Sequence, residues 1–387
     1  MSAISRPQPH ETTTNARRVA PNIRRKGVFL AASLSALLLV VSLLSIGSGQ
    51  LPIRVDQVVT ILADEVGIQP DISFNVGESF SYPAEYSTVQ RGTLINIRLP
   101  RVVLGLLIGA SLAAAGATIQ GMFRNPLADP GLIGISAGSA FAAALVIVLG
   151  NTAALSPLAG SLDEIGVPLR PIASFIGGVV TTLLIYRLAT VNGRTSVPTM
   201  LLAGIALNAL AGAGVGMLVA FADDSEIRDI TFWQLGSLVD GSWERVETVV
   251  PFILISLVPM LWLSRPLNAL LFGEIEAEHL GFNIQRTKQF IIVLAAVAVG
   301  TGVAVAGIVG FVGLVVPHLI RLLAGPDHRY VIPGSMLLGA ALLVGADLIA
   351  RTIAEGREIP LGVVTALIGA PFFLYLLLKD RERGTLI

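Results

Sequence analysis

The sequence predicts an all-α polytopic membrane protein with about ten transmembrane helices. Hydrophobic residues make up 53% of the 387 residues and charged residues only 13%, whereas soluble domains carry about 25% charged residues. The apolar residues gather in runs that are long enough to cross a bilayer. The chain also contains 40 glycines, which are frequent in membrane helices because small residues let the backbones approach closely.

Ten apolar segments support the predicted number of helices. Each is long enough to cross the hydrocarbon core at about 1.5 Å per residue, once tilt and shortening are allowed for. The seventh and the eighth segments nearly fuse. The segments are 28–46, 102–123, 131–149, 171–190, 198–221, 248–264, 289–307, 308–324, 331–350 and 361–378.

The charges of the loops test this number. If the N-terminus lies in the cytoplasm, ten crossings place 17 of the 26 Lys and Arg residues inside and 9 outside. The 26 acidic residues divide the other way, with 17 outside, 8 inside and Asp347 within a helix. An excess of Lys and Arg on the cytoplasmic side is the normal pattern of membrane proteins. An odd number of helices would remove it, so we expect ten helices with both termini inside.

Three regions follow from this arrangement. Residues 1–27 are polar and end in a basic cluster, so we expect a disordered cytoplasmic tail. Residues 28–378 form the transmembrane domain, and residues 379–387 form a second cytoplasmic tail. A cleaved signal peptide is the competing interpretation of the N-terminus. The first apolar run, at about 19 residues, is longer than a usual signal-peptide core, which favours an uncleaved helix.

The sequence offers little catalytic chemistry. It contains no cysteine and no Gly-Lys pair, which excludes cysteine-ligated metals and a P-loop for ATP. The four histidines are scattered without a metal-binding spacing, so we expect no metal, no cofactor and no catalytic residue. The net charge of zero gives no indication of a nucleic-acid partner. Asp347 is a functional candidate because it lies deep in an apolar segment, but Arg351 one turn later favours a local ion pair.

Two loops are long enough to carry a function. The outer loop 47–101 contains an amphipathic stretch, Val55–Val66, which fits either a lid or a surface for a partner or substrate. The inner loop 265–288 contains a short helix-like piece, Leu270–Gly281. A simple connection needs only a few residues, so this loop indicates docking of another protein at the cytoplasmic surface.

Nine stretches together resemble the FecCD-type permeases, the family of importers for ferric siderophores, haem and cobalamin. They occur in the family's order. The stretches are 98–101 leading into 109–121, 124–138, 201–208, 232–237, 271–274, 310–318, 325–329, 346–351 and 359–371. The resemblance implies the fold of a type II ABC importer permease, with ten helices in each subunit.

The resemblance also implies partners and sites. The permease would form a homodimer around one central pathway, with two ATP-binding cassette subunits inside and a substrate-binding protein outside. Arg98, Arg101 and Arg351 match the arginines that pair with glutamates of the binding protein. Arginine suits this role because its planar group binds a carboxylate through two hydrogen bonds.

The remaining candidate residues lie toward the cytoplasm. The family's ATPase-docking loop corresponds to Leu267–Gly281, and the candidates within it are Leu267, Leu271, Gly273, Glu274 and Gly281. Helix five lines the pathway in relatives, and the turn before it contributes the inner gate. The matching candidates are Ser196, Thr199 and Asn208, although helix packing explains any single one of them equally well.

The cargo is open to three interpretations within the family. The segments 201–216 and 228–237 look most like haem permeases, with a ferric siderophore or cobalamin as the alternative cargo. The resemblance places the chain in the inner membrane of a bacterium. Two other classes compete: an ion-coupled secondary transporter and a membrane-embedded enzyme. Both would require more titratable residues at mid-membrane than Asp347.

Overall fold

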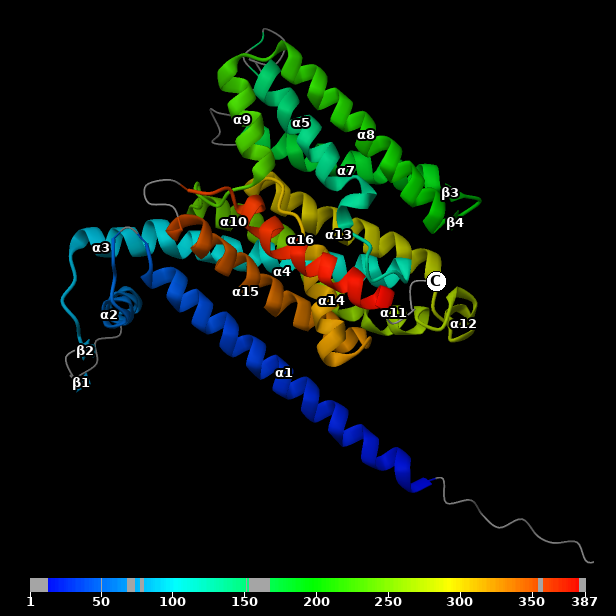
Figure 1. Ribbon diagram of the computed structural model, residues 1–387, viewed down its shortest axis with the longest axis horizontal. Helices are drawn as coiled ribbons and strands as arrows, with labels where there is room; N and C mark the ends of the chain where they lie inside the picture. The colour runs from blue at the N-terminus through cyan, green and yellow to red at the C-terminus, as the bar shows by residue number, and fades with distance from the viewer. Residues whose placement is uncertain are drawn as a thin grey trace, which may run out of the picture.

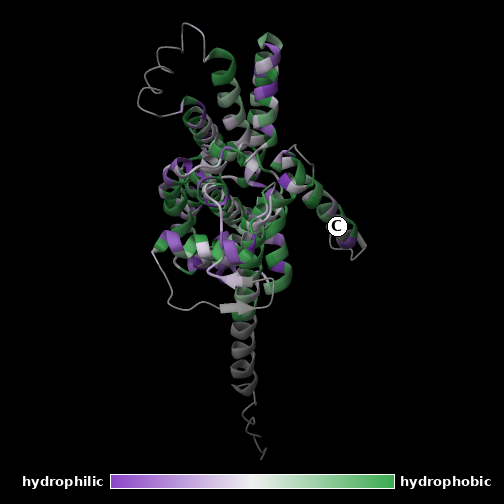
Figure 2. Cartoon of the chain, turned by 90° about the vertical axis from the view of Figure 1, so that its left-hand side faces the viewer, coloured by the Kyte–Doolittle hydropathy of each residue, from purple (hydrophilic) through white to green (hydrophobic). Residues whose placement is uncertain are grey.

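The computed structural model describes residues 13–49, 51–67, 74–76, 80–150, 152, 168–353 and 358–382. Nearly all of this chain is helical, and hydrophobic residues cover most of the helical ribbon (Figure 2). Ten helices coincide with the ten predicted segments. They are α1 Thr13–Gly47, α4 Leu99–Phe123, α5 Ile135–Leu149, α7 Leu169–Ala189, α8 Val197–Phe221, α10 Trp243–Trp262, α13 Ile284–Ala306, α14 Val312–Ala324, α15 His328–Thr352 and α16 Leu361–Glu382.

Shorter elements connect these helices. Two antiparallel pairs of strands occur in the described residues, β1 with β2 and β3 with β4. The predicted amphipathic stretch forms α2 with the expected bounds. The shorter elements are α2 Val55–Val66, β1 Phe74–Val76, β2 Phe80–Tyr82, α3 Thr88–Thr93, the π-helix η1 Leu94–Arg98, the 3-10 helix η2 Pro130–Ile133, β3 Thr190–Val191, β4 Arg194–Thr195, α9 Asp224–Leu235, α11 Ser264–Leu270 and α12 Glu274–His279.

The predicted membrane-spanning class is confirmed. Among the described residues, seven helices are long and apolar enough to cross a membrane, and three shorter apolar helices lie at Ile135–Leu149, Val312–Ala324 and Leu361–Tyr375. The short helix α14 follows a non-helical stretch, 307–311, which separates it from α13. Such backbone is tolerated at membrane depth only where protein surrounds it. Gly307 and Val309 are buried accordingly.

Several helices extend beyond the predicted segments. The first begins at Thr13, so the part of the expected disordered tail from Thr13 onward is helical. Adding turns to an existing helix needs no new nucleus, which explains how a polar segment can continue it. Helix α10 begins at Trp243 because Ser242 caps it through the Arg245 N–H. At the other end α16 continues to Glu382, while residues 1–12 and 383–387 lie outside the described part.

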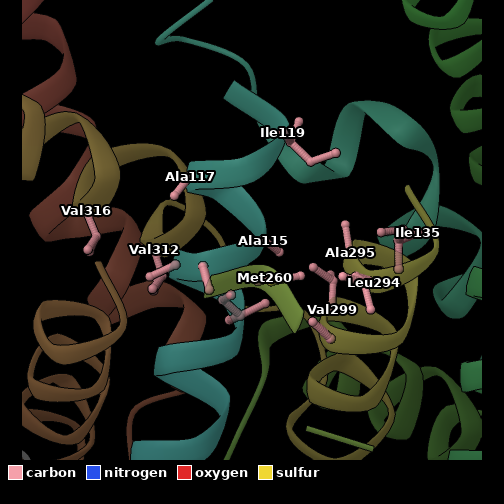
Figure 3. Packing of buried hydrophobic residues seen from close by; sticks show 14 of the residues in the cluster. Ala115, Ala117, Ile119, Ile135, Met260, Leu294, Ala295, Val299, Val312 and Val316 are labelled. Carbon is pink, nitrogen blue, oxygen red and sulfur yellow. The ribbon is translucent and has the colours of Figure 1, made fainter. Parts of the chain in front are cut away.

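Helix α4 forms the centre of the bundle. Of its most apolar stretch, 78% is buried, and it packs against α10, α13, α14 and α15. Apolar side chains from these helices pack together in Figure 3, including Ala115, Met260 and Val312. A methyl group at Gly116 would overlap the carbonyl group of Gly313. Gly116 therefore lets α4 and α14 pack closely, as expected for glycines in membrane helices.

The connecting elements lie at two opposite ends of the bundle (Figure 1). Helices α2 and α3 and the β1–β2 hairpin lie at one end, close to the start of α4. Helices α11 and α12 and the β3–β4 hairpin lie at the other end. We call these the arginine end, after Arg98, Arg101 and Arg351, and the α12 end. Between them runs α8, of whose most apolar stretch only 6% is buried.

Candidate functional site

Arg101, in the first turn of α4, is the centre of a buried ionic cluster at the arginine end. Its Nε and Nη2 groups donate to the Asp347 carboxylate of α15 at 2.8–3.0 Å. Its Nη1 and Nη2 groups also donate to the two carboxylate oxygens of Glu358, at 3.0 and 3.1 Å. The Arg101 and Asp347 side chains are 9% and 4% exposed, whereas Glu358 is 39% exposed. The guanidinium group is therefore shared by one buried carboxylate and one accessible carboxylate.

The two other predicted arginines bind the last turn of α1 and the backbone that follows it. Arg98 donates to the carbonyl groups of Ile46 and Gly47, at 2.8 and 2.9 Å, and to that of Leu51. Arg351 donates to the carbonyl groups of Ser48, at 2.9 Å, and of Ser45, and to the Ser45 hydroxyl group at 2.7 Å. These bonds fix the end of α1 to α4 and α15.

The structure thus brings the three arginines together, but it buries all three in contacts within the subunit. The local pair expected between Asp347 and Arg351 is the weaker of two, because the Arg351 Nε lies 3.6 Å from Asp347 and Arg101 lies closer. Helical spacing did not indicate this partner, because it reports only neighbours on one helix. Glu358 was not predicted either, although it directly precedes the recognised stretch 359–371.

The outer loop is held by Asp56 at the start of α2. Its carboxylate accepts hydrogen bonds from the backbone N–H groups of Gln57 and Ser81, at 2.9 and 3.2 Å, and from Arg54 at 2.7 Å. Burial acts to raise the pKa of Asp56, but these hydrogen bonds and the Arg54 charge outweigh it, so the pKa lies below its usual value. Asp56 therefore joins α2 to the β1–β2 hairpin most firmly when it is ionised.

Two short helices at the α12 end expose apolar side chains. Between them Gly273 has a φ of 127°, a conformation that L residues rarely adopt. The predicted single piece, Leu270–Gly281, is therefore broken into α11 and α12. Leu271 is 43% exposed. Three further large apolar side chains are more exposed: Phe272 (76%), Ile275 (66%) and Leu280 (64%).

The five residues predicted for ATPase docking differ in their surroundings. Leu267 is fully buried, so it anchors α11 in the core of the subunit. Gly273 and Gly281 lie in the turns on either side of α12, with φ of 127° and 88°. Glu274 accepts two hydrogen bonds from Lys288, each at 2.8 Å. No pattern in the sequence indicates this partner, because Lys288 looks like one more loop cation.

The three predicted pathway residues separate into two places. Ser196 caps α8, and its hydroxyl group accepts a hydrogen bond from the Thr199 hydroxyl at 2.9 Å. Both residues are exposed at the start of the helix. Asn208 instead donates to the Gly131 carbonyl at 3.2 Å. It joins α8 to the turn before α5, as expected for helix packing.

The described residues contain no group of three or more His, Cys, Asp and Glu side chains that could hold a metal ion. Among the histidines, His328 is buried beside α11. Its backbone N–H donates to the Asn268 side chain at 2.8 Å, and its Nδ1 lies 3.0 Å from the same oxygen. This histidine thus fixes the start of α15 to α11.

A bundle of apolar helices with these two ends defines a multi-pass membrane protein. The chain belongs to the FecCD transport family, whose sequence model matches residues 37–379. It is 43% identical over 289 residues to the hemin transport system permease HmuU of Yersinia pestis, covering 75% of this chain and 84% of that protein. It is also 43% identical over 306 residues to the cobalamin import permease BtuC of Halobacterium salinarum, covering 79% and 78%.

Two further comparisons support this family. The vitamin B12 import permease BtuC of Klebsiella pneumoniae is 37% identical over 318 residues, covering 81% of this chain and 91% of that protein. A metal-chelate type ABC transporter in an inward-facing conformation has a similar structure, with a TM-score of 0.74 and 30% identity. The match covers 90% of this chain and 98% of that one. The chain is therefore a transport permease of an ABC importer and has the predicted fold.

Proposed function

We propose that this chain is the permease subunit of an ATP-driven importer of an iron chelate, and that haem is its cargo. Two copies form a homodimer around one pathway, with two ATP-binding cassette subunits at the α12 end and a substrate-binding protein at the arginine end. The observation that carries the proposal is the separation of these two surfaces to opposite ends of the bundle (Figure 1). Because ATP is hydrolysed by separate subunits, this chain moves cargo without covalent chemistry.

The distribution of cations supports a cytoplasmic position for the α12 end. The exposed arginines of this end include Arg124, Arg187, Arg194, Arg265, Arg286 and Arg329. Lys and Arg concentrate on the cytoplasmic side of membrane proteins. In this orientation both termini lie in the cytoplasm, and the arginine end faces outward from a bacterial inner membrane.

The exposure of helix α8 supports the proposal that two copies of the chain form a dimer. Its large side chains Leu202, Ile205, Leu210 and Met217 are 60–69% exposed in the isolated subunit. A long helix that its own subunit barely covers can line a pathway between two subunits. When ATP binding draws the cassette subunits together, the α12 ends move with them, and the pathway changes from outward to inward access.

The arginine end supports docking through exchange of a carboxylate. Asp347 is buried and holds Arg101 from within, while Glu358 binds the same guanidinium group at the accessible side. We propose that a glutamate of the binding protein takes the place of Glu358 on Arg101. Arg98 and Arg351 then shape the surface by fixing the end of α1.

The cargo is proposed from the relatives and from two segments of the chain. The hemin permease of Yersinia pestis and the cobalamin permease of Halobacterium salinarum share the same 43% identity with this chain. Sequence identity alone therefore does not distinguish haem from cobalamin as the cargo. We favour haem because of segments 201–216 and 228–237, and ferric siderophore and cobalamin are the alternatives.

Uptake into liposomes tests the proposal. The chain is reconstituted with the cassette and binding proteins encoded beside it, and haem, a ferric siderophore and cobalamin are offered separately. We expect uptake of haem that requires ATP and all three proteins. Uptake by this chain alone, driven by an ion gradient without nucleotide, would establish a secondary transporter instead. Preference for cobalamin or a siderophore would correct the cargo and leave the class unchanged.

A further inference from the structure

Lys288 is the largest fully buried side chain of the described residues, with only 1% of the residue exposed. It lies in the second turn of α13, at the α12 end. A buried ammonium group is unfavourable unless it is paired and all of its donors are satisfied. The sequence suggests a solvated cation at the end of a loop, so the burial of Lys288 must be explained by its contacts.

The three N–H donors of Lys288 reach two separate elements. Its Nζ lies 2.8 Å from both carboxylate oxygens of Glu274, the first residue of α12. It also lies 3.1 Å from the carbonyl oxygen of Thr195, in strand β4. These three acceptors match the three donors of an ammonium group. One side chain thus joins the predicted docking helix to the hairpin before α8.

A second residue of α13 holds the same hairpin. The Gln285 side-chain oxygen accepts from the Thr195 N–H at 2.9 Å. Both backbone groups of Thr195 are therefore bound by α13, one by Gln285 and one by Lys288. Thr195 is itself buried, and its hydroxyl group lies 3.0 Å from that of Thr190 across the hairpin.

The hairpin leads directly into α8. Ser196 follows Thr195, caps α8 and bonds to Thr199. Helix α8 is less enclosed by its own subunit than α4, because only 6% of its most apolar stretch is buried, against 78% for that of α4. A displacement of the hairpin would therefore move the start of α8 more easily than it would move the tightly packed α4.

We propose that Lys288 is the positioning residue that transmits movement of α12 to α8, through Glu274 on one side and the Thr195 carbonyl on the other. The inference rests on the proposed function, since it assigns the route by which a cassette subunit bound at α12 opens the pathway. Glu274 follows the moving helix, Lys288 follows Glu274 at 2.8 Å, and Thr195 carries the displacement to the cap of α8.

Substitution of Lys288 tests the link, with Arg286 as the matched control. Lys288→Met keeps the length and apolar stem of the side chain but removes all three hydrogen bonds. Arg286→Met removes an exposed cation two residues earlier on the same helix. In the reconstituted transporter we expect Lys288→Met to lower the cargo moved per ATP hydrolysed by about tenfold or more, while Arg286→Met leaves this ratio unchanged. An unchanged ratio in Lys288→Met would overturn the proposal.

A distance measurement within the subunit separates this inference from the proposed function. The chain has no cysteine, so Glu278→Cys in α12 and Arg194→Cys in β4 can carry spin labels at exposed positions. We expect a narrow distribution of distances between the labels, which broadens when Lys288→Met is added. The charge exchange Glu274→Lys with Lys288→Glu should stay broad, because a carboxylate at 288 cannot donate to the Thr195 carbonyl.

The two measurements fail in different ways. An equally narrow distribution in both Lys288 variants would overturn the link, whether or not the chain transports. Absence of ATP-dependent uptake by the unmodified transporter, with distances that still broaden, would instead overturn the proposed function. Glu274→Gln provides a milder second variant in case Lys288→Met folds poorly. It should broaden the distribution in the same direction, and an unchanged distribution would count against the link.

Discussion

Arg101 of α4 and Asp347 of α15 form an ion pair in the interior of the arginine end, with 2.8 Å between Nη2 and Oδ1. The two residues are far apart in the sequence, and their side chains are 9% and 4% exposed. A buried charge that loses its partner is strongly destabilising, whereas replacement of both partners by apolar groups is often tolerated. This pair therefore makes the packing of α4 against α15 depend on both residues at once.

Asp347→Leu alone should lower the free energy of unfolding by about 3–5 kcal/mol, because it leaves the Arg101 charge buried and half-paired. Adding Arg101→Met should recover a large part of this loss. Denaturant titration of the purified protein in detergent measures both. Arg245→Met is the control, since its pair with Asp240 spans 3.4 Å at the surface and should contribute no more than about 1 kcal/mol. Equal losses for the single and double variants would contradict a buried pair.

Glu358→Gln should strengthen capture of the binding protein, because it weakens the carboxylate that competes for Arg101. The competing pair is partly exposed, so it should contribute about 1 kcal/mol, or about fivefold in Kd. Surface plasmon resonance on the detergent-solubilised permease measures this affinity. Charge reversal at Arg98, Arg101 or Arg351 should weaken capture. Weaker capture by Glu358→Gln would show that Glu358 itself contacts the partner.

Gly116→Val should destabilise the subunit by about 1–3 kcal/mol or more, because its side chain would overlap the Gly313 carbonyl where α4 crosses α14. Gly92→Ala in α3 is the matched control, since nothing lies within 4 Å of the added carbon. Alanine favours helix over glycine by about 0.5–1 kcal/mol, so this control should be neutral or slightly stabilising. Thermal unfolding in detergent compares the two, and a stable Gly116→Val variant would refute the close approach.

The helices could be predicted because membrane-crossing segments require long apolar runs and loop charges reveal their direction. The same signal fails where polar turns extend a helix, as at Trp243, and where α13 and α14 meet without a polar loop. Hydropathy identifies the hydrocarbon region, whereas capping and backbone geometry determine where a helix ends. Gly307, with φ of 69°, marks that junction, which is where the predicted segments 289–307 and 308–324 meet.

For the candidate sites, the sequence could predict which residues lie at the arginine end and at the α12 end, but not the partners to which they bind. Resemblance identified Arg101 and Glu274, but their partners Asp347 and Lys288 lie 246 and 14 residues away, and each of these pairs joins two helices. No periodicity within one helix can reveal such a pair. The motifs that contain Asn208 and Leu267 likewise did not indicate that Asn208 bonds to Gly131 or that Leu267 is fully buried.

Asp56→Asn should loosen the outer loop at neutral pH, because the hydrogen bonds from Gln57 and Ser81 favour the ionised carboxylate. Since the folded pKa is lowered, this stabilisation is fully present above the ordinary pKa of about 4 and is lost as the pH falls through the lower folded pKa. A spin label at Val66→Cys, which is 73% exposed, reports the mobility of α2. We expect it to become mobile below about pH 4 in the unmodified chain and at all pH values in Asp56→Asn. Glu85→Gln, an exposed neighbour, should leave mobility unchanged, and a Val66 label indifferent to both pH and Asp56→Asn would contradict the role of this carboxylate.

Phe272→Ser and Ile275→Ser should weaken binding of the cassette subunit, because both side chains are exposed apolar groups between and within α11 and α12. Each substitution should weaken the binding free energy by about 1.5–3 kcal/mol if the side chain becomes fully buried in the complex, which corresponds to an increase in Kd of about 10–150-fold. Val191→Ser is the control, since Val191 is 67% exposed at the same end but lies on the β3–β4 hairpin. Titration of the purified cassette protein against permease in nanodiscs measures each affinity. If the Val191 variant alone lost affinity, the hairpin would be the docking surface, and α12 would have to act from elsewhere.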